Sequence, residues 1–158
     1  MISTRDTQAS EEEEAKPESN PFEEAKDSHL KRGFPKFLLA TAAHPSHTGR
    51  CVFVDICESI GRVLAESNPA KLREQWENNF KMQLLDLASD RCYDVRLRLV
   101  RMLAAFGKGG GEKHPRLARV LLSESELEAL LKKLVDDQGR EIRVMALQIG
   151  GSSSSRDH

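Results

Sequence analysis

Acidic and basic side chains that return at a fixed spacing are the residues of this chain with the clearest potential for chemistry. Asp90 and Asp137 lie 47 residues apart, Arg96 and Arg143 share that spacing, and Arg50 lies 46 residues before Arg96. A carboxylate near a helix start and a guanidinium at repeated positions can make charge-assisted hydrogen bonds. The alternative is that these charges form only a solvated face.

Metal and disulfide chemistry are not favoured by the other candidate residues. His44 and His47 bracket the first turn and could form a metal cluster with Cys51. A turn histidine is usually solvated, however, and a zinc site needs four ligands or three ligands and a water. Cys57 and Cys92 add no CxxC spacing, which argues against a disulfide framework. We therefore predict no metal site and interpret the cysteines as small buried hydrophobic side chains.

A nucleotide-binding or catalytic function is not favoured either. The glycine tract at residues 107–111 follows no predicted strand and contains neither G-x-G-x-x-G nor G-x-x-x-x-G-K-[ST], so we interpret it as a linker. No Ser/His/Asp or Cys/His set has an interpretable spacing. The sequence therefore predicts no enzymatic activity and no cofactor.

Helices are expected to position the charged residues, because an apolar pattern repeats together with them. The spacing of 47 residues joins four apolar pairs: Leu84 and Leu131, Leu87 and Leu134, Val95 and Ile142, and Val100 and Leu147. A weaker copy begins at Leu38. A period of about 40 to 47 residues, with an apolar helix, a polar turn and a second helix, is typical of HEAT or armadillo arrays. We predict an all-α fold, an α-solenoid of about three helical pairs at residues 34–65, 69–107 and 115–149.

Caps and apolar spacing predict where the earlier helices begin and end. The first helix is expected to start near Pro35 and the second to span about residues 49–65. Asn68 is predicted to cap the next helix, with Pro69 in its first turn. Trp76 could stack on a ligand, but its i+4 spacing within an apolar stripe favours a place in the core.

The later helices are predicted in the same way. Asp94 is predicted to cap the helix that follows the second turn. A short helix is expected at residues 115–122, and Ser123 with Glu126 matches a capping box. The last helix is predicted to begin at Glu141 and to end near residue 150.

The last helix carries Ile142, Leu147 and Ile149, and no further apolar segment follows to cover them. Helical pairs in an array gain stability by stacking, and terminal pairs need polar faces. We therefore expect the chain to be a fragment or a shortened form of a longer array, with a disordered tail at residues 150–158.

Charge is distributed unevenly along the chain. Residues 1–30 carry 3 basic and 9 acidic side chains, which leaves 21 basic and 16 acidic side chains for the rest, a net charge of +5. The acidic segment has few apolar residues, so we predict a disordered tail. No signal peptide or membrane span is expected, which predicts a location in the cytoplasm or nucleus.

The repeated motif resembles the HEAT repeats of protein phosphatase subunits. It reads L-x-x-L-x-x-D, then a short turn, then D-V-R or E-I-R at the start of an apolar helix, and it matches best over residues 80–106. It is similar to the A-type scaffold subunit of protein phosphatase 2A and to the HEAT-repeat regulatory subunit of protein phosphatase 4. The first unit departs from the pattern, because Thr48 replaces the acid and Gly49 the valine.

The resemblance implies a ladder between adjacent units and a binding surface at the turns. The ladder residues would be Arg50, Asp90, Arg96, Asp137 and Arg143. The turn surface would comprise Arg91, Tyr93, Asp94, Gln138, Arg140 and Glu141. Tyr93 is the expected hot spot, although an exposed tyrosine packed on its own turn is the alternative.

The implied partner is a catalytic or regulatory subunit of a serine/threonine phosphatase. HEAT arrays also serve nuclear transport and chromosome organisation, and a fold does not fix a function, so those roles are the second hypothesis. Some HEAT-like proteins are DNA glycosylases. One Trp, one Tyr and a modest positive charge do not favour nucleic-acid binding here.

Overall fold

The computed structural model describes residues 35–107 and 114–151, and every regular element in these ranges is a helix apart from an isolated bridge between Phe106 and Arg116. The predicted all-α class is confirmed for this part of the chain. After a helix at residues 35–42, the elements are α2 (His47–Glu66), α3 (Ala70–Gln75), the π-helix η1 (Trp76–Phe80), α4 (Lys81–Asp86), the 3-10 helix η2 (Leu87–Ser89), α5 (Tyr93–Ala104), α6 (Leu117–Leu121), α7 (Glu124–Leu134) and α8 (Arg140–Gly151).

The predictions for the two tails and the linker fall largely outside the described residues. These include the acidic segment at residues 1–30, residues 108–111 of the glycine tract and residues 152–158. Gly150 and Gly151, which we expected in the C-terminal tail, instead form the last two residues of α8.

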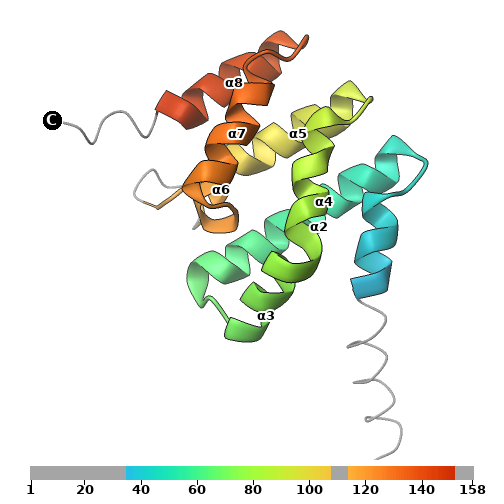
Figure 1. The fold of residues 1–158 in the computed structure, drawn as a ribbon, viewed down its shortest axis with the longest axis vertical. Helices are drawn as coiled ribbons and strands as arrows, with labels where there is room; N and C mark the ends of the chain where they lie inside the picture. Colours follow the sequence, from blue (N-terminus) through green and yellow to red (C-terminus); the bar gives the residue numbers. More distant parts are fainter. Residues whose placement is uncertain (1–34, 108–113, 152–158) are drawn as a thin grey trace, which may run out of the picture.

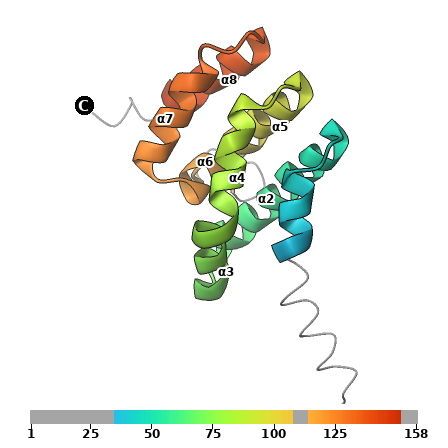
Figure 2. The ribbon, with the colours of Figure 1, turned by 45° about the vertical axis from the view of Figure 1, so that its right-hand side comes forward.

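Helices α2, α5 and α8 lie side by side in chain order, so α5 contacts α2 on one side and α8 on the other (Figure 1). The segment from α3 to η2 leads into α5, and α7 leads into α8. The turns at residues 43–46, 90–92 and 135–139 follow one another along one edge, at the upper right of Figure 1, and the turned view in Figure 2 keeps this order. α6 contacts α2, α5 and α7.

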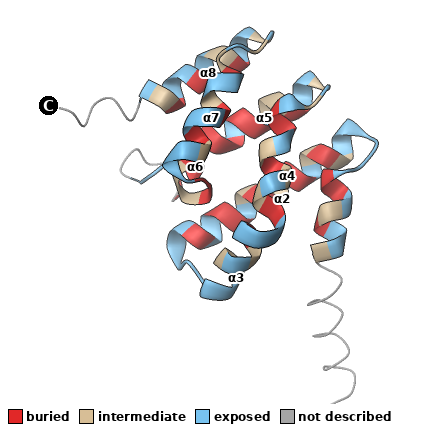
Figure 3. Ribbon diagram, in the orientation of Figure 1, coloured by how far each residue is buried: buried red, intermediate tan, exposed pale blue. Residues whose placement is uncertain are grey.

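The core consists of apolar side chains on the faces where these helices meet, and the buried residues in Figure 3 mark those faces. Trp76 is fully buried, which confirms the predicted core position. Its indole Nε1 donates a hydrogen bond to the backbone oxygen of Leu121 in α6, at 2.8 Å. The ring therefore fixes α6 against η1 through one polar contact inside an apolar region. Phe80, at the other end of η1, is also fully buried.

The start of one helix confirms the predicted capping box, and the start of another shows a cap that the sequence analysis did not predict. Ser123 accepts a hydrogen bond from the Glu126 N–H while the Glu126 side chain accepts one from the Ser123 N–H, so the predicted capping box is present. α2 begins at His47 because the Ser46 side chain accepts from the Thr48 N–H. This cap lengthens α2 by two residues relative to the predicted start.

The prediction that Asn68 caps the following helix is wrong. Pro69 occupies the N-cap position without a side-chain hydrogen bond, and α3 begins at Ala70. Asn68 has a φ of 43°, a left-handed conformation that asparagine tolerates better than most residues. Its side-chain oxygen accepts from Arg73 Nε at 3.0 Å, so it serves a guanidinium instead of a backbone N–H.

The predicted cap at Asp94 is also wrong, because the N-cap of α5 is Cys92, two residues earlier, and the helix begins at Tyr93. Asp94 lies in the first turn of α5, where a negative charge favours the positive end of the helix dipole. Asp90 instead holds the turn, since its Oδ1 accepts from the Cys92 N–H at 2.9 Å.

The end of the row is less exposed than the sequence predicted. Ile142 and Ile149 are fully buried because α8 packs against both α5 and α7, so the prediction that they lack a cover is wrong. Leu147 is 62% exposed, as expected.

Trp76→Phe is expected to lower the free energy of unfolding by about 2 to 4 kcal/mol, because it leaves the Leu121 oxygen unpaired and removes buried ring volume. Urea unfolding followed by circular dichroism measures this loss. Met82→Leu changes an exposed side chain of α4 and should alter the free energy by less than about 0.5 kcal/mol. Equal losses in the two variants would contradict the role assigned to Trp76.

Candidate functional site

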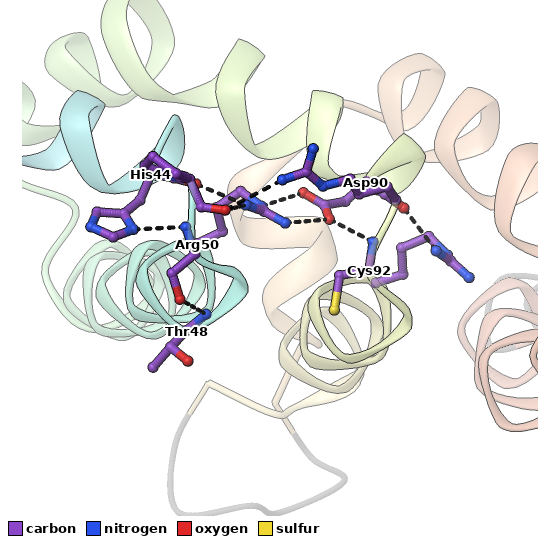
Figure 4. A network of polar contacts seen from close by, with 9 residues as sticks. His44, Thr48, Arg50, Asp90 and Cys92 are labelled. Atoms are coloured by element: carbon purple, nitrogen blue, oxygen red, sulfur yellow. Dashed lines mark hydrogen bonds and ion pairs between the residues drawn. The ribbon is translucent and has the colours of Figure 1, made fainter.

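Arg50, near the start of α2, joins the inter-helix turn at residues 43–46 to the one at residues 90–92. Its Nε lies 2.7 Å from Asp90 Oδ2, and its Nη2 lies 3.2 Å from Asp90 Oδ1 (Figure 4). Its Nη1 donates to the backbone oxygens of His44 and Pro45, at 2.8 and 3.0 Å. Both Arg50 and Asp90 are largely buried. One guanidinium therefore binds its own turn and the next turn together.

The second and third turns are joined in the same way by Arg96. Its Nε lies 2.7 Å from Asp137 Oδ2, and its Nη2 donates to Asp137 Oδ1 at 3.4 Å. Its Nη1 donates to the backbone oxygen of Asp90 at 2.7 Å, which repeats the contact of Arg50 with its own turn. The repeated sequence spacing is thus matched by a repeated hydrogen-bond geometry.

Each aspartate also fixes the backbone of its own turn. Asp137 Oδ1 accepts from the Gly139 N–H at 2.8 Å, as Asp90 Oδ1 does from Cys92. Burial by itself would raise the pKa of Asp137, but the hydrogen bonds from Arg96 and Gly139 outweigh it, and the pKa lies below its usual value. The carboxylate is therefore held ionised by the contacts that build the turn.

The first turn has a histidine where the other two turns have aspartate. His44 lies 46 residues before Asp90, and its Nδ1 accepts from the Ser46 N–H at 3.0 Å. The same backbone task, accepting the N–H two residues further on, is therefore done by an imidazole. The sequence alone does not indicate that His44 is this counterpart, because histidine and aspartate share neither a residue type nor a charge pattern.

Arg143 occupies the third ladder position. Its Nη1 donates to the backbone oxygens of Asp137 and Gln138, at 2.8 and 2.9 Å. This contact corresponds to that of Arg50 and Arg96 with their own turns. Within residues 35–107 and 114–151, no carboxylate pairs with Arg143, whereas Arg50 and Arg96 each hold one.

The turn residues predicted to form a binding surface lie along the exposed edge, and several of them contact a neighbouring turn. Arg91 Nη2 donates to the Pro45 oxygen of the preceding turn at 3.3 Å. The Tyr93 ring lies over Gly139 of the following turn, so close that a Cβ at Gly139 would come within 2.2 Å of it. Tyr93 therefore packs on the next turn, and the Arg96 guanidinium of its own helix lies 6.0 Å from the centroid of its ring. The Arg91 and Tyr93 side chains both remain exposed.

The other four predicted surface residues are exposed as well. Glu141 forms an ion pair with Arg101 of α5, at 2.6 Å. The remaining three are Asp94, Gln138 and Arg140. The structure thus brings all six predicted residues to the same edge, with Tyr93 and Arg91 crossing between turns.

An ion pair on the solvent side also joins α5 to α2. Arg98 of α5 binds Asp55 of α2, with Nε 2.6 Å from Oδ1. The side chains of Arg98 and Asp55 are 48% and 42% exposed, against 15% and 7% for Arg96 and Asp137. Since water screens exposed pairs, the two sets of contacts should differ in their contribution to stability.

Two of the three cysteines, Cys51 and Cys57, have thiols that their surroundings disfavour as thiolates. Cys57 is buried, as predicted, and burial raises its pKa. Cys51 is only half-buried, and burial also raises its pKa. Both shifts disfavour the thiolate, the reactive form of a cysteine. Cys92 is half-buried, so the prediction of fully buried cysteines holds only for Cys57.

Among the described residues, no group of three or more His, Cys, Asp or Glu side chains is placed to hold a metal ion. No helix in the described ranges is long and apolar enough to cross a membrane. Comparison of the chain with protein-family models, with curated proteins and with solved structures finds no match.

Arg96→Ala is expected to lower the free energy of unfolding by about 2 to 3 kcal/mol, because it leaves the shielded Asp137 carboxylate without its cation. Arg98→Ala removes only an exposed pair and should cost less than about 1 kcal/mol. Thermal and urea unfolding of the two variants provide the measurement. Similar losses would show that the Arg96 contacts act as an ordinary surface pair.

The Asp137 carboxylate predicts a dependence of stability on pH. Its pKa is lower in the folded chain than the value of about 3.9 expected when unfolded, so its contribution is complete above that value and is lost as the pH falls through the folded pKa. Asp137→Asn should be less stable than the parent at pH 7, and the difference should shrink below about pH 4. Urea unfolding between pH 7 and pH 3 tests this, and a constant difference would refute it.

Proposed function

We propose that the chain is part of a HEAT-like α-solenoid and acts as a non-catalytic scaffold or regulatory subunit for a serine/threonine protein phosphatase. The arrangement of α2, α5 and α8 supports the first part, because the same helix contact and the same Arg–Asp contact occur twice in succession. The repeated motif and its likeness to phosphatase scaffold subunits support the second part.

The observation that carries the proposal is the row of exposed turn side chains above a shielded ionic network. Ion pairs with Asp90 and Asp137 fix the spacing of the three turns. Arg140 and Tyr93 then project from neighbouring turns whose separation is held constant. Preorganised side chains lose less conformational entropy on binding, which suits a docking surface for a folded partner.

The edge also has the composition of a protein interface. Tyr and Arg are enriched among residues that contribute most to binding, and Tyr93, Arg91 and Arg140 all stand on it. Asp94, Gln138 and Glu141 place polar and acidic groups beside them. We infer that a partner would cross the turns and contact at least two of them at once.

Arg140→Ala should weaken binding to the catalytic subunit of a serine/threonine phosphatase by at least about tenfold, the effect of losing one well-placed interface contact. Surface plasmon resonance with the full chain immobilised and purified catalytic subunits in solution measures this. Tyr93→Ala should weaken binding too, and circular dichroism must show that its fold is kept, because the ring also packs on Gly139.

Lys71→Ala, on the exposed surface of α3 away from the turns, is the matched control and should bind like the parent chain. Affinity purification with mass spectrometry provides the broader comparison. Recovery of transport cargo or chromatin proteins in place of phosphatase subunits, with the same dependence on Arg140, would overturn the phosphatase assignment and favour the second hypothesis.

A further inference from the structure

The end of the row formed by α7 and α8 has an open apolar surface. Leu147 of α8 is mostly exposed and Val144 is exposed beside it. A groove of about 830 Å³ runs between the two helices, and its apolar lining includes Leu131, Val135 and Leu147. Exposed apolar surface of this kind often marks a site of association.

The equivalent positions in the two preceding helical pairs indicate that this surface is one that a neighbouring helical pair covers. Val100 and Val54 stand at the positions equivalent to Leu147, and both are fully buried. Leu84, the counterpart of Leu131, is likewise fully buried. These counterparts lie where one helical pair meets its neighbours, so Leu147 and Leu131 occupy positions that a neighbouring pair covers elsewhere in the chain.

Arg143 places hydrogen-bond donors beside this apolar surface. In Arg50 and Arg96, Nη1 donates to backbone oxygens of the turn that precedes the helix. Their Nε and Nη2 bind the aspartate carboxylate of the next turn along the row. Arg143 makes the first contact through Nη1 to Asp137 and Gln138. Among the described residues, its Nε and Nη2 make no hydrogen bond and no ion pair, so the guanidinium is oriented by the preceding turn as in Arg50 and Arg96 but binds no carboxylate of a following turn.

We propose that the α7–α8 end is a docking surface for a helical pair of a partner protein, whose turn presents an aspartate to Arg143. The carboxylate would bind Nε and Nη2, and the partner's apolar helices would cover Leu147, Leu131 and Val135. Charge complementarity and the two existing copies of this interface define the occupant. The surface is distinct from the turn edge proposed to bind a phosphatase.

A second copy of this chain does not fit the surface. In a head-to-tail arrangement the incoming first turn would present His44 where an aspartate is needed, and Asp90 and Asp137 are already engaged by Arg50 and Arg96.

The experiment joins a defined probe to the full chain. A flexible Gly/Ser linker of about 30 residues follows His158 and leads to a second copy of residues 70–122, which keeps the contact of Trp76 with Leu121 and carries its own copy of Asp90 in its turn. Circular dichroism of the extended chain checks that the added segment is helical. Hydrogen–deuterium exchange of residues 144–151 reports docking, because this sequence occurs only in the original α8. We expect exchange there to slow by at least about tenfold relative to the unextended chain.

The dependence on charge makes the test specific. Changing the probe's copy of Asp90 to Asn should remove most of the added protection, Arg143→Ala should do the same, and the two changes together should do no more than either alone. Lys133→Ala is the control, because its Nζ contacts Ser89 on the preceding unit, and it should leave the protection intact. Leu147→Glu, at an exposed position, tests the apolar part of the surface independently of Arg143 and should also remove most of the added protection.

The other outcomes overturn the proposal. Exchange that is unchanged by the probe, or slowed equally without its aspartate and without Arg143, would show that the end does not recognise this turn. Analytical ultracentrifugation measures the oligomeric state of the chain without the probe. A dimer that Leu147→Glu converts to a monomer would assign the surface to a second copy of the chain.

Discussion

The structure depends on the need to cover both faces of the central helix. α5 buries Leu99 and Leu103 completely, and it contacts α2 on one side and α8 on the other. The hydrophobic effect is non-directional, so apolar burial specifies the register of two helices less sharply than a hydrogen-bonded ion pair does. A shielded ion pair is different, since a misplaced partner leaves an uncompensated charge. The Arg–Asp pairs therefore set the register in which the apolar faces meet.

The identity of the cation matters for this role. A lysine would offer one point charge, whereas the planar guanidinium divides its donors between two directions. In Arg96, Nη1 binds the turn that precedes it, and Nε binds Asp137 of the following turn. Asp137 in turn accepts the Gly139 N–H. A single chain of contacts thus connects the backbone of one turn to the backbone of the next, which makes the spacing of the exposed turn side chains a property of the fold.

Much of this arrangement could be predicted from the sequence, because repetition at a constant spacing carries information about neighbours. The helical class follows from aligned copies of one motif, and the core position of Trp76 follows from its i+4 spacing in an apolar stripe. The ladder that joins Arg50 to Asp90 was implied by the resemblance of that motif to HEAT repeats. What could not be predicted depends on tertiary context. Asn68 was assigned as a cap from its residue type, but Pro69 displaces it and Arg73 takes its oxygen. Ile142 was expected to lack cover because periodicity identifies an apolar face without identifying what packs on it.

The replacement of aspartate by His44 in the first turn gives the row two chemically different ends. The turn still closes, because Nδ1 accepts the Ser46 N–H, but the anionic group that an arginine of a preceding unit would need is missing. The other end keeps its arginine, Arg143. An aspartate at position 44 would give this row of three turns a carboxylate at one end and an arginine at the other, and complementary groups of that kind favour head-to-tail contacts, which can propagate into open filaments. With histidine at one end, the same backbone geometry is kept while this route to self-association loses its charge pair.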